Sequence, residues 1–244
     1  MILAIDIGNT RIKAAVFEGD ILLDVFVFLK IDLQKNIQNI FKIHQKIKNL
    51  VVSAVSDVEK QSFSMLNDAL NIHFVSHNDR FPFRNTYETP QTLGVDRMVL
   101  AAGATLRFPN QNRLVIDAGT CITYDFIDEN DNYLGGAISP GLQLRYKALH
   151  DYTAKLPLLA LDNPENFIGK STLESIHSGV VNGLAYEIDG FINTYKDKYS
   201  KFIIILTGGD TEFLANRLKN TIFANSNFLL ESLNQTFQYK IKND

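Results

Sequence analysis

The chain has 244 residues, enough for one or two domains of ordinary size. Apolar residues make up 45% of it and charged residues 21%, which is typical of a globular protein and excludes a disordered one. With 24 Lys and Arg against 27 Asp and Glu the formal charge is −3, so there is no broad basic field, and we expect no nucleic-acid partner.

The first half of the chain is predicted to alternate between strands and helices. Continuous apolar runs predict strands, and apolar residues at helical spacing predict helices. The expected elements are strands at 2–7, 11–17 and 21–28, a helix at 32–46, a strand at 49–55, a helix through 57–70, a strand at 72–76 and a helix at 94–107. Gly8-Asn9 between the first two strands is a hairpin signal, because both residue types tolerate positive φ.

The second half of the chain is predicted to follow a similar pattern. The Gly pair and the Pro-Gly of the stretch YLGGAISPGL suggest a tight excursion of the backbone. The expected order is a strand within 113–120, a strand at 122–126, the excursion at 133–142, a helix at 171–195, a strand at 202–206, a helix after TGGD at 207–210 and a last helix at about 227–237.

One segment of the chain occurs twice. LAIDIG at 3–8 returns as LVIDAG at 114–119, and in each copy an apolar strand ends in Asp-x-Gly before a second strand begins. We interpret this as a duplicated βββαβα unit that forms two similar α/β lobes, 1–112 and 113–244. The alternative is a chance match, because Asp-x-Gly turns are common.

The two Asp-x-Gly turns predict a nucleotide cleft between the lobes. A glycine turn presents backbone N–H groups to an anion, and Asn9 and Thr10 add side-chain donors. Asp6 is then placed to hold Mg²⁺, although it would alternatively cap local N–H groups. If the lobes face each other, Asp6 and Asp117 converge and require a cation, while the turn after the strand at 202–206 suits phosphate or ribose.

The stretch NTYETPQTLGVDR at 85–97 carries a second kind of signal. Asp96 falls in the first turn of the predicted helix, where the helix dipole favours a negative charge. An ionised carboxylate beside Arg97 suits a hydroxyl acceptor that carries its own carboxylate, because arginine pairs with carboxylates in a bidentate manner. The alternatives are an Asp that only starts the helix and a solvated surface arginine.

Taken in order, seven segments of the chain resemble the type III pantothenate kinases, members of the acetate kinase, sugar kinase, Hsp70 and actin superfamily. The segments are AIDIGNT (4–10), NTYETPQTLGVDR (85–97), VIDAGTCITYD (115–125), GGAISPGL (135–142), TAKLP (153–157), IGKST (168–172) and LTGGD (206–210). The resemblance implies an α/β fold of two ribonuclease H-like, actin-like ATPase lobes with an interlobe nucleotide cleft. The second lobe, 113–244, would also carry the dimerisation helices.

The resemblance also implies an activity, the ATP-dependent phosphorylation of pantothenate to 4′-phosphopantothenate at the start of coenzyme A synthesis, with Asp96 as the base. The ATP and phosphate contacts would be Asp6, Ile7, Gly8, Asn9, Thr10, Arg11, Ile12, Lys13 and Thr120. The substrate would be held by Tyr87, Gly94, Val95, Asp96 and Arg97, and by Thr172 from the neighbouring subunit of a homodimer. Mg²⁺ would lie near Asp6, and K⁺ or NH₄⁺ would bind at Asp117.

Other functions stay open from the sequence alone. They are a non-catalytic adaptor of the same fold, an ATP-switched scaffold and a kinase for another small alcohol. The single cysteine, Cys121, fits a reducing compartment and is expected to be a packing residue. No apolar run is long enough to span a bilayer, and the N-terminus does not resemble a signal peptide, so we expect a cytoplasmic protein without a membrane partner.

Overall fold

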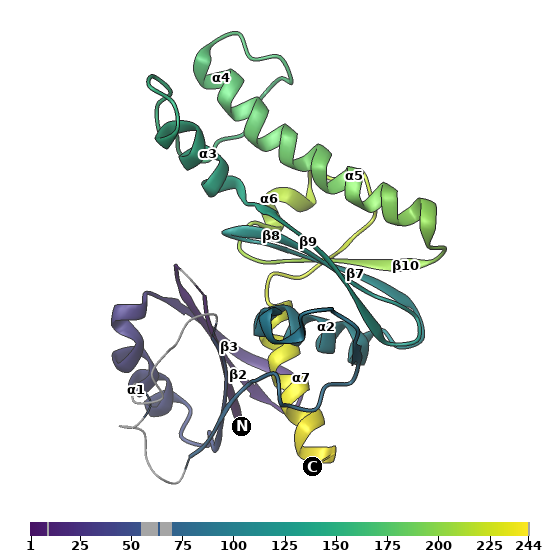
Figure 1. Ribbon diagram of the computed structural model, residues 1–244. Coiled ribbons are helices and arrows are strands. Elements are labelled where there is room, and N and C mark those ends of the chain that lie inside the picture. The colour runs from purple at the N-terminus through teal and green to yellow at the C-terminus, as the bar shows by residue number, and fades with distance from the viewer. Residues whose placement is uncertain (9, 55–62, 64–69, 244) are drawn as a thin grey trace. The chain divides into compact units, whose positions relative to one another are not determined.

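The computed structural model describes residues 1–8, 10–54, 63 and 70–243. The chain forms two compact units (Figure 1), of which unit 1 contains Met1–Asn110, Glu129–Leu134 and Asn227–Asp244, and unit 2 contains Gln111–Asp128 and Gly135–Ser226. The predicted lobes, 1–112 and 113–244, divide the chain only once. Unit 1 instead also contains two segments from the second half of the chain, Glu129–Leu134 and Asn227–Asp244, the latter with the last helix. The lobe boundary therefore stays a prediction.

Unit 1 is built on a five-stranded sheet with the order β3-β2-β1-β4-β5. The central strand β1 runs antiparallel to β2 and parallel to β4. The strands are β1 (Ile2–Ile7), β2 (Ile12–Glu18), β3 (Ile21–Phe28), β4 (Asn49–Ala54) and β5 (Asn71–Phe74), which confirms the strands predicted here. The helix predicted through 57–70 lies almost entirely outside the described residues.

Helices cover both faces of this sheet because successive residues of a strand point to opposite sides. Leu3 and Ile5 of β1 belong to the apolar cluster that contains the buried side of α1 (Leu33–Ile43). Ile2 and Ala4 belong to a second cluster with α2 (Val95–Arg107) and α7 (Phe228–Asn243). Two short 3₁₀ segments, Lys30–Asp32 and Pro90–Thr92, precede α1 and α2.

The second sheet repeats the strand order of the first. Its order is β11-β10-β7-β8-β9-β6, and its central strand β7 is antiparallel to β8 and parallel to β10. The strands are β6 (Arg84–Asn85), β7 (Asn112–Ala118), β8 (Cys121–Ile127), β9 (Asn132–Pro140), β10 (Phe202–Thr207) and β11 (Phe223–Ala224). The series β9-β8-β7-β10-β11 corresponds to β3-β2-β1-β4-β5, so the predicted duplication is confirmed.

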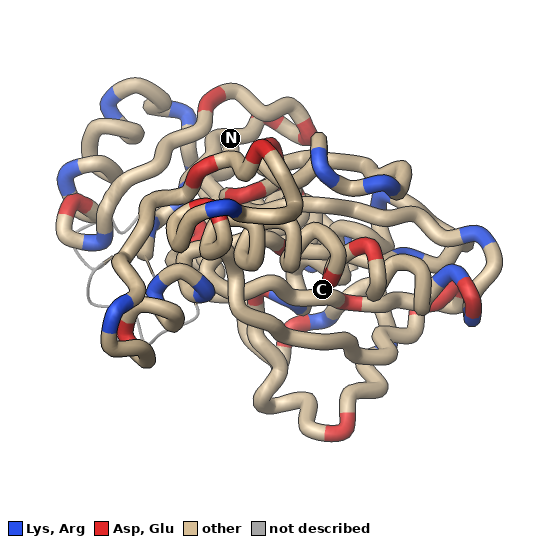
Figure 2. Tube along the Cα trace, turned by 90° about the horizontal axis from the view of Figure 1, so that it is seen from above, with Lys and Arg blue, Asp and Glu red and all other residues tan. Residues whose placement is uncertain are grey.

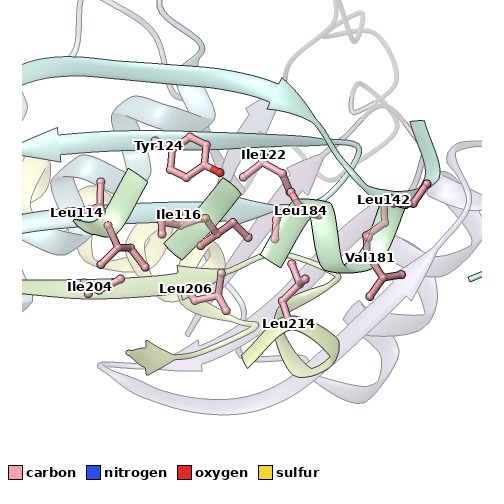
Figure 3. Close-up of a cluster of buried hydrophobic side chains, with 14 of the residues drawn as sticks. Leu114, Ile116, Ile122, Tyr124, Leu142, Val181, Leu184, Ile204, Leu206 and Leu214 are labelled. Atoms are coloured by element: carbon pink, nitrogen blue, oxygen red, sulfur yellow. The ribbon is translucent and has the colours of Figure 1, made fainter. Parts of the chain in front are cut away.

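Unit 2 packs its helices on one face of its sheet. Its helices are α3 (Leu142–Asp151), α4 (Thr172–His177), α5 (Gly183–Lys198) and α6 (Thr211–Ala215), with a π-helical segment, Ser178–Asn182, between α4 and α5. Alternate apolar residues of β7, β8 and β10 meet these helices in one core (Figure 3). The long helix predicted at 171–195 is therefore one helical run that changes its hydrogen-bonding pattern part-way.

The prediction of a backbone excursion at 133–142 is wrong, because most of this stretch is strand β9. Its glycines serve a different purpose from turn formation. A Cβ on Gly136 would lie 1.5 Å from the carbonyl oxygen of Tyr124 on β8, and Gly135 has a φ of 102°. These positions need glycine for close approach and for left-handed backbone, while the surrounding residues continue the strand.

The distribution of charged residues and the apolar character of the helices concern two possible partners, nucleic acid and a membrane. Acidic and basic residues are interspersed along the trace in Figure 2. In the described part of the chain, no helix combines the length and apolar character that crossing a membrane requires.

Candidate active site

Asp6 lies near the end of β1, beside polar residues of both neighbouring strands. It is 8% exposed and is in register with Lys13 on β2 and Ser53 on β4. The hydroxyl of Ser53 is buried and has no hydrogen-bond partner among the described residues. In the following turn, the N–H of Gly8 donates to the carbonyl oxygen of Arg11 (3.2 Å). A carboxylate, a hydroxyl and a lysine therefore occupy neighbouring positions in the sheet at the strand end where the sequence predicts phosphate and Mg²⁺.

The other members of the predicted phosphate segment differ in what their side chains reach. Ile7 and Ile12 are buried in an apolar cluster, so only their backbone is available to a phosphate. Thr10 and Arg11 are exposed. Asn9 lies outside the described residues. The predicted hairpin is confirmed by the β1–β2 pairing, but Gly8 is not among the glycines with positive φ.

Asp117 occupies the equivalent position in unit 2. It is in register with Thr123 on β8 and Thr207 on β10. Both threonine hydroxyls are buried, and neither has a hydrogen-bond partner among the described residues. Each copy of the repeat thus places an Asp at the end of its central strand with a hydroxyl on a neighbouring strand.

Backbone turns from three segments meet at the end of β7. The N–H of Gly141 donates to the carbonyl oxygen of Thr120, and the N–H of Asp210 donates to that of Ala118, both at 3.0 Å. A Cβ on Gly141 would lie 2.0 Å from the carbonyl oxygen of Gly119, so no other residue fits there without displacement. The segments DAGT, SPGL and TGGD therefore form one arrangement of hydrogen-bonded backbone at the end of β7.

Gly208 brings the TGGD turn directly onto Asp117. Its φ is 101°, and a Cβ at this position would lie 2.4 Å from Oδ1 of Asp117. The hydroxyl of Thr211 donates to the carbonyl oxygen of Gly208 (2.8 Å), which closes the turn at the start of α6. Cys121, next to this arrangement, is exposed, so the prediction that it is a packing residue is wrong.

Asp96 is held at the start of α2. Its Oδ1 accepts a hydrogen bond from the N–H of Arg97 (2.8 Å), and a Cβ on Gly94 would lie 2.4 Å from the same oxygen. The preceding backbone is fixed by His77, whose Nε2 lies 2.8 Å from the carbonyl oxygen of Leu93. The carboxylate thus has a defined place in the first helical turn, as predicted.

The other predicted substrate residues lie close to this helix start in the sequence but differ in burial. Arg97 is 6% exposed, so the alternative of a solvated surface arginine is wrong. Val95 packs its side chain against the apolar cluster under α2 and α7. The ring of Tyr87 contacts that of Tyr133 edge-on, with centroids 6.1 Å apart. Tyr87 is therefore positioned by the neighbouring strand segment.

Thr172 lies at the start of α4. The hydroxyl of Ser171 caps this helix by accepting from the N–H of Glu174 (3.3 Å). Thr172 is exposed and lines an open groove of about 1200 Å³ between α3 and α4, together with Arg145, Tyr152 and Lys170.

Two residues of the strand ends were missed by the sequence analysis, Ser53 and Thr123. Ser53 follows no glycine motif, Thr123 lies on the strand after Asp-Ala-Gly, and each becomes notable only through its register with an Asp of the repeat. Pairing the strands of the repeat on paper would have identified both.

The fold and the strand ends first define a class. Two sheets of the same strand order, each with Asp-x-Gly ending its central strand, form a duplicated α/β fold that solved structures of other proteins share. Solved structures of similar fold include a protein described as a Baf family transcriptional activator from Campylobacter jejuni (TM-score 0.64, 22% identity, 98% of this chain and 99% of that one). Another is the activator of 2-hydroxyisocaproyl-CoA dehydratase from Clostridium difficile with bound ADPNP (TM-score 0.56, 12% identity, 99% and 96%).

The sequence comparisons then give the family. The type III pantothenate kinase family model matches residues 2–194. Type III pantothenate kinase from Flavobacterium johnsoniae is 70% identical over 244 residues, covering 100% of both chains. That from Flavobacterium psychrophilum is 58% identical over 240 residues, covering 98% of this chain and 100% of the relative. The chain belongs to the type III pantothenate kinase family.

Proposed function

We propose that Asp96 is the general base through which this chain carries out the family's reaction. That reaction transfers the γ-phosphoryl group of ATP to the 4′-hydroxyl of pantothenate and gives 4′-phosphopantothenate and ADP. The supporting observation is the fixed place of Asp96 at the start of α2, inside the region matched by the family model. The kinase family implies ATP and pantothenate as substrates.

Asp96 would act late in the reaction. A carboxylate is a weak base toward a free alcohol, but phosphoryl transfer passes through a loose transition state in which the hydroxyl becomes acidic only as its bond to phosphorus forms. Most of the rate then comes from positioning and from neutralising charge on the phosphoryl oxygens. The defined contacts of Asp96 with Gly94 and Arg97 suit such a role, because they hold the carboxylate before the substrate arrives.

The strand ends would bind the nucleotide and its cations. The turn after β1, with Asp6, and the turn after β7, with Thr120, would contact the phosphates. Asp6 with the hydroxyl of Ser53 offers the oxygen ligands that Mg²⁺ prefers. Mg²⁺ bound there would neutralise charge on the phosphoryl group.

Asp117 would hold the monovalent cation, K⁺ or NH₄⁺. The donor set fits such an ion, because one carboxylate and the buried hydroxyls of Thr123 and Thr207 are oxygen ligands. A bound cation would offset the negative charge of Asp117 near the nucleotide phosphates.

The substrate would be held by Tyr87, Gly94, Val95 and Arg97. Thr172 would reach it from the partner in a homodimer, which agrees with its exposure on the groove between α3 and α4. The single cysteine and the metabolic substrates favour a cytoplasmic location.

The test is ADP release by the purified protein with Mg-ATP, measured with and without pantothenate and with and without K⁺. Release that requires pantothenate and is stimulated by K⁺ is the expected result. Slow release that ignores pantothenate would instead indicate an ATP-switched scaffold or a kinase for another alcohol. A folded protein that releases no ADP would support the adaptor function.

A further inference from the structure

Glu187 on α5 gathers side chains from three other elements of unit 2. Its Oε1 accepts hydrogen bonds from the hydroxyl of Tyr124 on β8 (3.1 Å) and from that of Ser139 on β9 (2.5 Å). Its Oε2 pairs with the guanidinium of Arg145 on α3. The carboxylate therefore ties together two strands and two helices, and the reaction proposed above assigns it no role.

The cluster formed by Glu187, Tyr124, Ser139 and Arg145 also fixes the end of β9. Besides its bond to Glu187, Arg145 donates from Nε to the carbonyl oxygen of Pro140 (2.8 Å), and its Nη2 lies 3.4 Å from the hydroxyl of Ser139. Two consecutive residues of β9 are thus held by a side chain that Glu187 itself orients.

The next residue along the chain carries this constraint to the turn after β7. Gly141 donates its N–H to the carbonyl oxygen of Thr120 and has no room for a side chain against Gly119. Any shift of Ser139 and Pro140 would move Gly141, and because Gly141 is in tight backbone contact, the Gly119–Thr120 turn would move with it.

The charges within the cluster are matched. Burial alone would raise the pKa of Glu187, but the hydrogen bonds from Ser139 and Arg145 outweigh this effect and lower it. Burial, and then the neighbouring Glu187 carboxylate, raise the pKa of Tyr124. Near neutral pH the carboxylate is therefore an ionised acceptor and the tyrosine a protonated donor. The ring of Tyr124 also stacks on Phe191, one turn along α5 (centroids 4.2 Å apart).

We propose that Glu187 is a positioning residue for ATP binding, which acts through Arg145 and Ser139 on the Gly119–Thr120 turn. The inference rests on the proposed contact between Thr120 and ATP. It assigns Glu187 no contact with either substrate. Loss of its charge would loosen the turn and weaken ATP binding, although the substitution removes no atom that touches ATP.

The test compares Glu187→Gln with a second carboxylate variant on the same helix. Asp189→Asn is a matched control, because Asp189 also lies on α5 but accepts from Lys219 N–H (3.2 Å) and Asn220 Nδ2 (2.7 Å), away from β9. We expect Glu187→Gln to raise KM for ATP about tenfold, as loss of one hydrogen bond to a charged group would, and to leave KM for pantothenate unchanged. Asp189→Asn should lower the melting temperature without changing KM for ATP.

A milder variant covers the case in which Glu187→Gln does not fold. Ser139→Ala removes one hydroxyl from the cluster and should raise KM for ATP about threefold, the low end of what a hydrogen bond contributes. Calorimetric titration with a non-hydrolysable ATP analogue, without pantothenate, should rank the variants in the same order.

The outcomes separate this inference from the proposed function. A KM for ATP in Glu187→Gln within twofold of the parent value, with a lowered melting temperature, would show that the cluster only stabilises unit 2 and would overturn the inference. Thr120→Ala is measured alongside. If Thr120→Ala raises KM for ATP and the cluster variants do not, only the inference fails. If Thr120→Ala leaves KM for ATP unchanged, the assigned role of Thr120 and the inference both fail.

Discussion

Asp96 is the residue on which the proposed chemistry depends most directly. Asp96→Asn keeps the size of the side chain but removes the base, so kcat should fall by about 10²- to 10⁴-fold while ATP binding stays nearly intact. The measurement is kcat together with the dissociation constant of an ATP analogue. Glu212→Gln, which changes an exposed first-turn carboxylate of α6, should match the parent protein. Lost nucleotide affinity with preserved turnover would contradict the role of Asp96.

Gly94 determines the room available to the same carboxylate. In Gly94→Ala the new methyl group would lie 2.4 Å from Oδ1 of Asp96, which is the end of a short side chain and yields by rotating away. We therefore expect kcat to fall by about tenfold to a hundredfold, because small misplacements of a catalytic group are costly, with little change in melting temperature. An alanine variant with the kinetics of the parent would show that the position of the carboxylate is not critical.

Asp117 provides a residue-scale test of the cation site. Asp117→Ala removes the only carboxylate in the proposed oxygen donor set and leaves the hydroxyls of Thr123 and Thr207. Activity should become low and insensitive to K⁺, measured as ADP release across a series of K⁺ concentrations. A variant that responds to K⁺ as the parent does would remove Asp117 from the site.

Residue patterns in the sequence predicted local features of the site better than contacts between strands. Asp96 could be placed at a helix start, because that position depends on its immediate neighbours. Ser53 and Thr123 do not stand out in the sequence, because their position beside Asp6 and Asp117 becomes evident only when the strands of each repeat are paired in register. The burial of Arg97 was likewise invisible, since it depends on what packs around α2.

Among the elements, the crossing of α2 and α7 depends on one glycine. A Cβ on Gly103 would lie 1.9 Å from Oγ of Ser232 and 2.9 Å from its Cα, so Gly103→Ala should destabilise the protein by about 1–3 kcal/mol through overpacking. Gly190 on α5 is exposed, and a Cβ there would meet no neighbouring atom of the described residues within 4 Å, so Gly190→Ala should stabilise by about 1 kcal/mol. Urea unfolding measures both. If both variants changed the free energy of unfolding equally and in the same direction, close packing at Gly103 would be refuted.

Strands and helices were predicted where one residue pattern dominates. β1 and β7 each carry an apolar run that ends at the Asp of the repeat, and their assignments are confirmed. The sequence predicts an excursion where β9 lies, because Gly135 and Gly136 resemble turn residues when their neighbours in space are unknown. The glycine pair instead allows the close approach of β9 to β8, which is a contact between strands. A pair of glycines in a sequence does not reveal whether it serves a turn or such a contact.

At the scale of the whole molecule, the last helix completes the first unit. α7 contributes Leu230, Leu233 and Phe237 to the cluster with β1 and β2. Burial of each such side chain is worth about 1.5–3 kcal/mol, and together they are comparable with the typical net stability of about 5–15 kcal/mol. A chain ending at Ser226 should therefore lose cooperative unfolding of unit 1.

Circular dichroism and limited proteolysis during heating would test this expectation. A chain that lacks only residues 241–244 is the control, because the described residues of this removed segment are exposed. Unchanged thermal unfolding of the chain ending at Ser226 would show that α7 is dispensable for unit 1.

The return of the chain to unit 1 also sets an order for folding on the ribosome. Domains usually fold in the order in which they are synthesised, N-terminal first. Here all of unit 2, Gln111–Asp128 and Gly135–Ser226, is translated before the helix that closes unit 1. Part of one apolar face of the N-terminal sheet therefore stays uncovered until α7 has been synthesised, and a ribosome that stalls before α7 leaves that part open to chaperones and proteases.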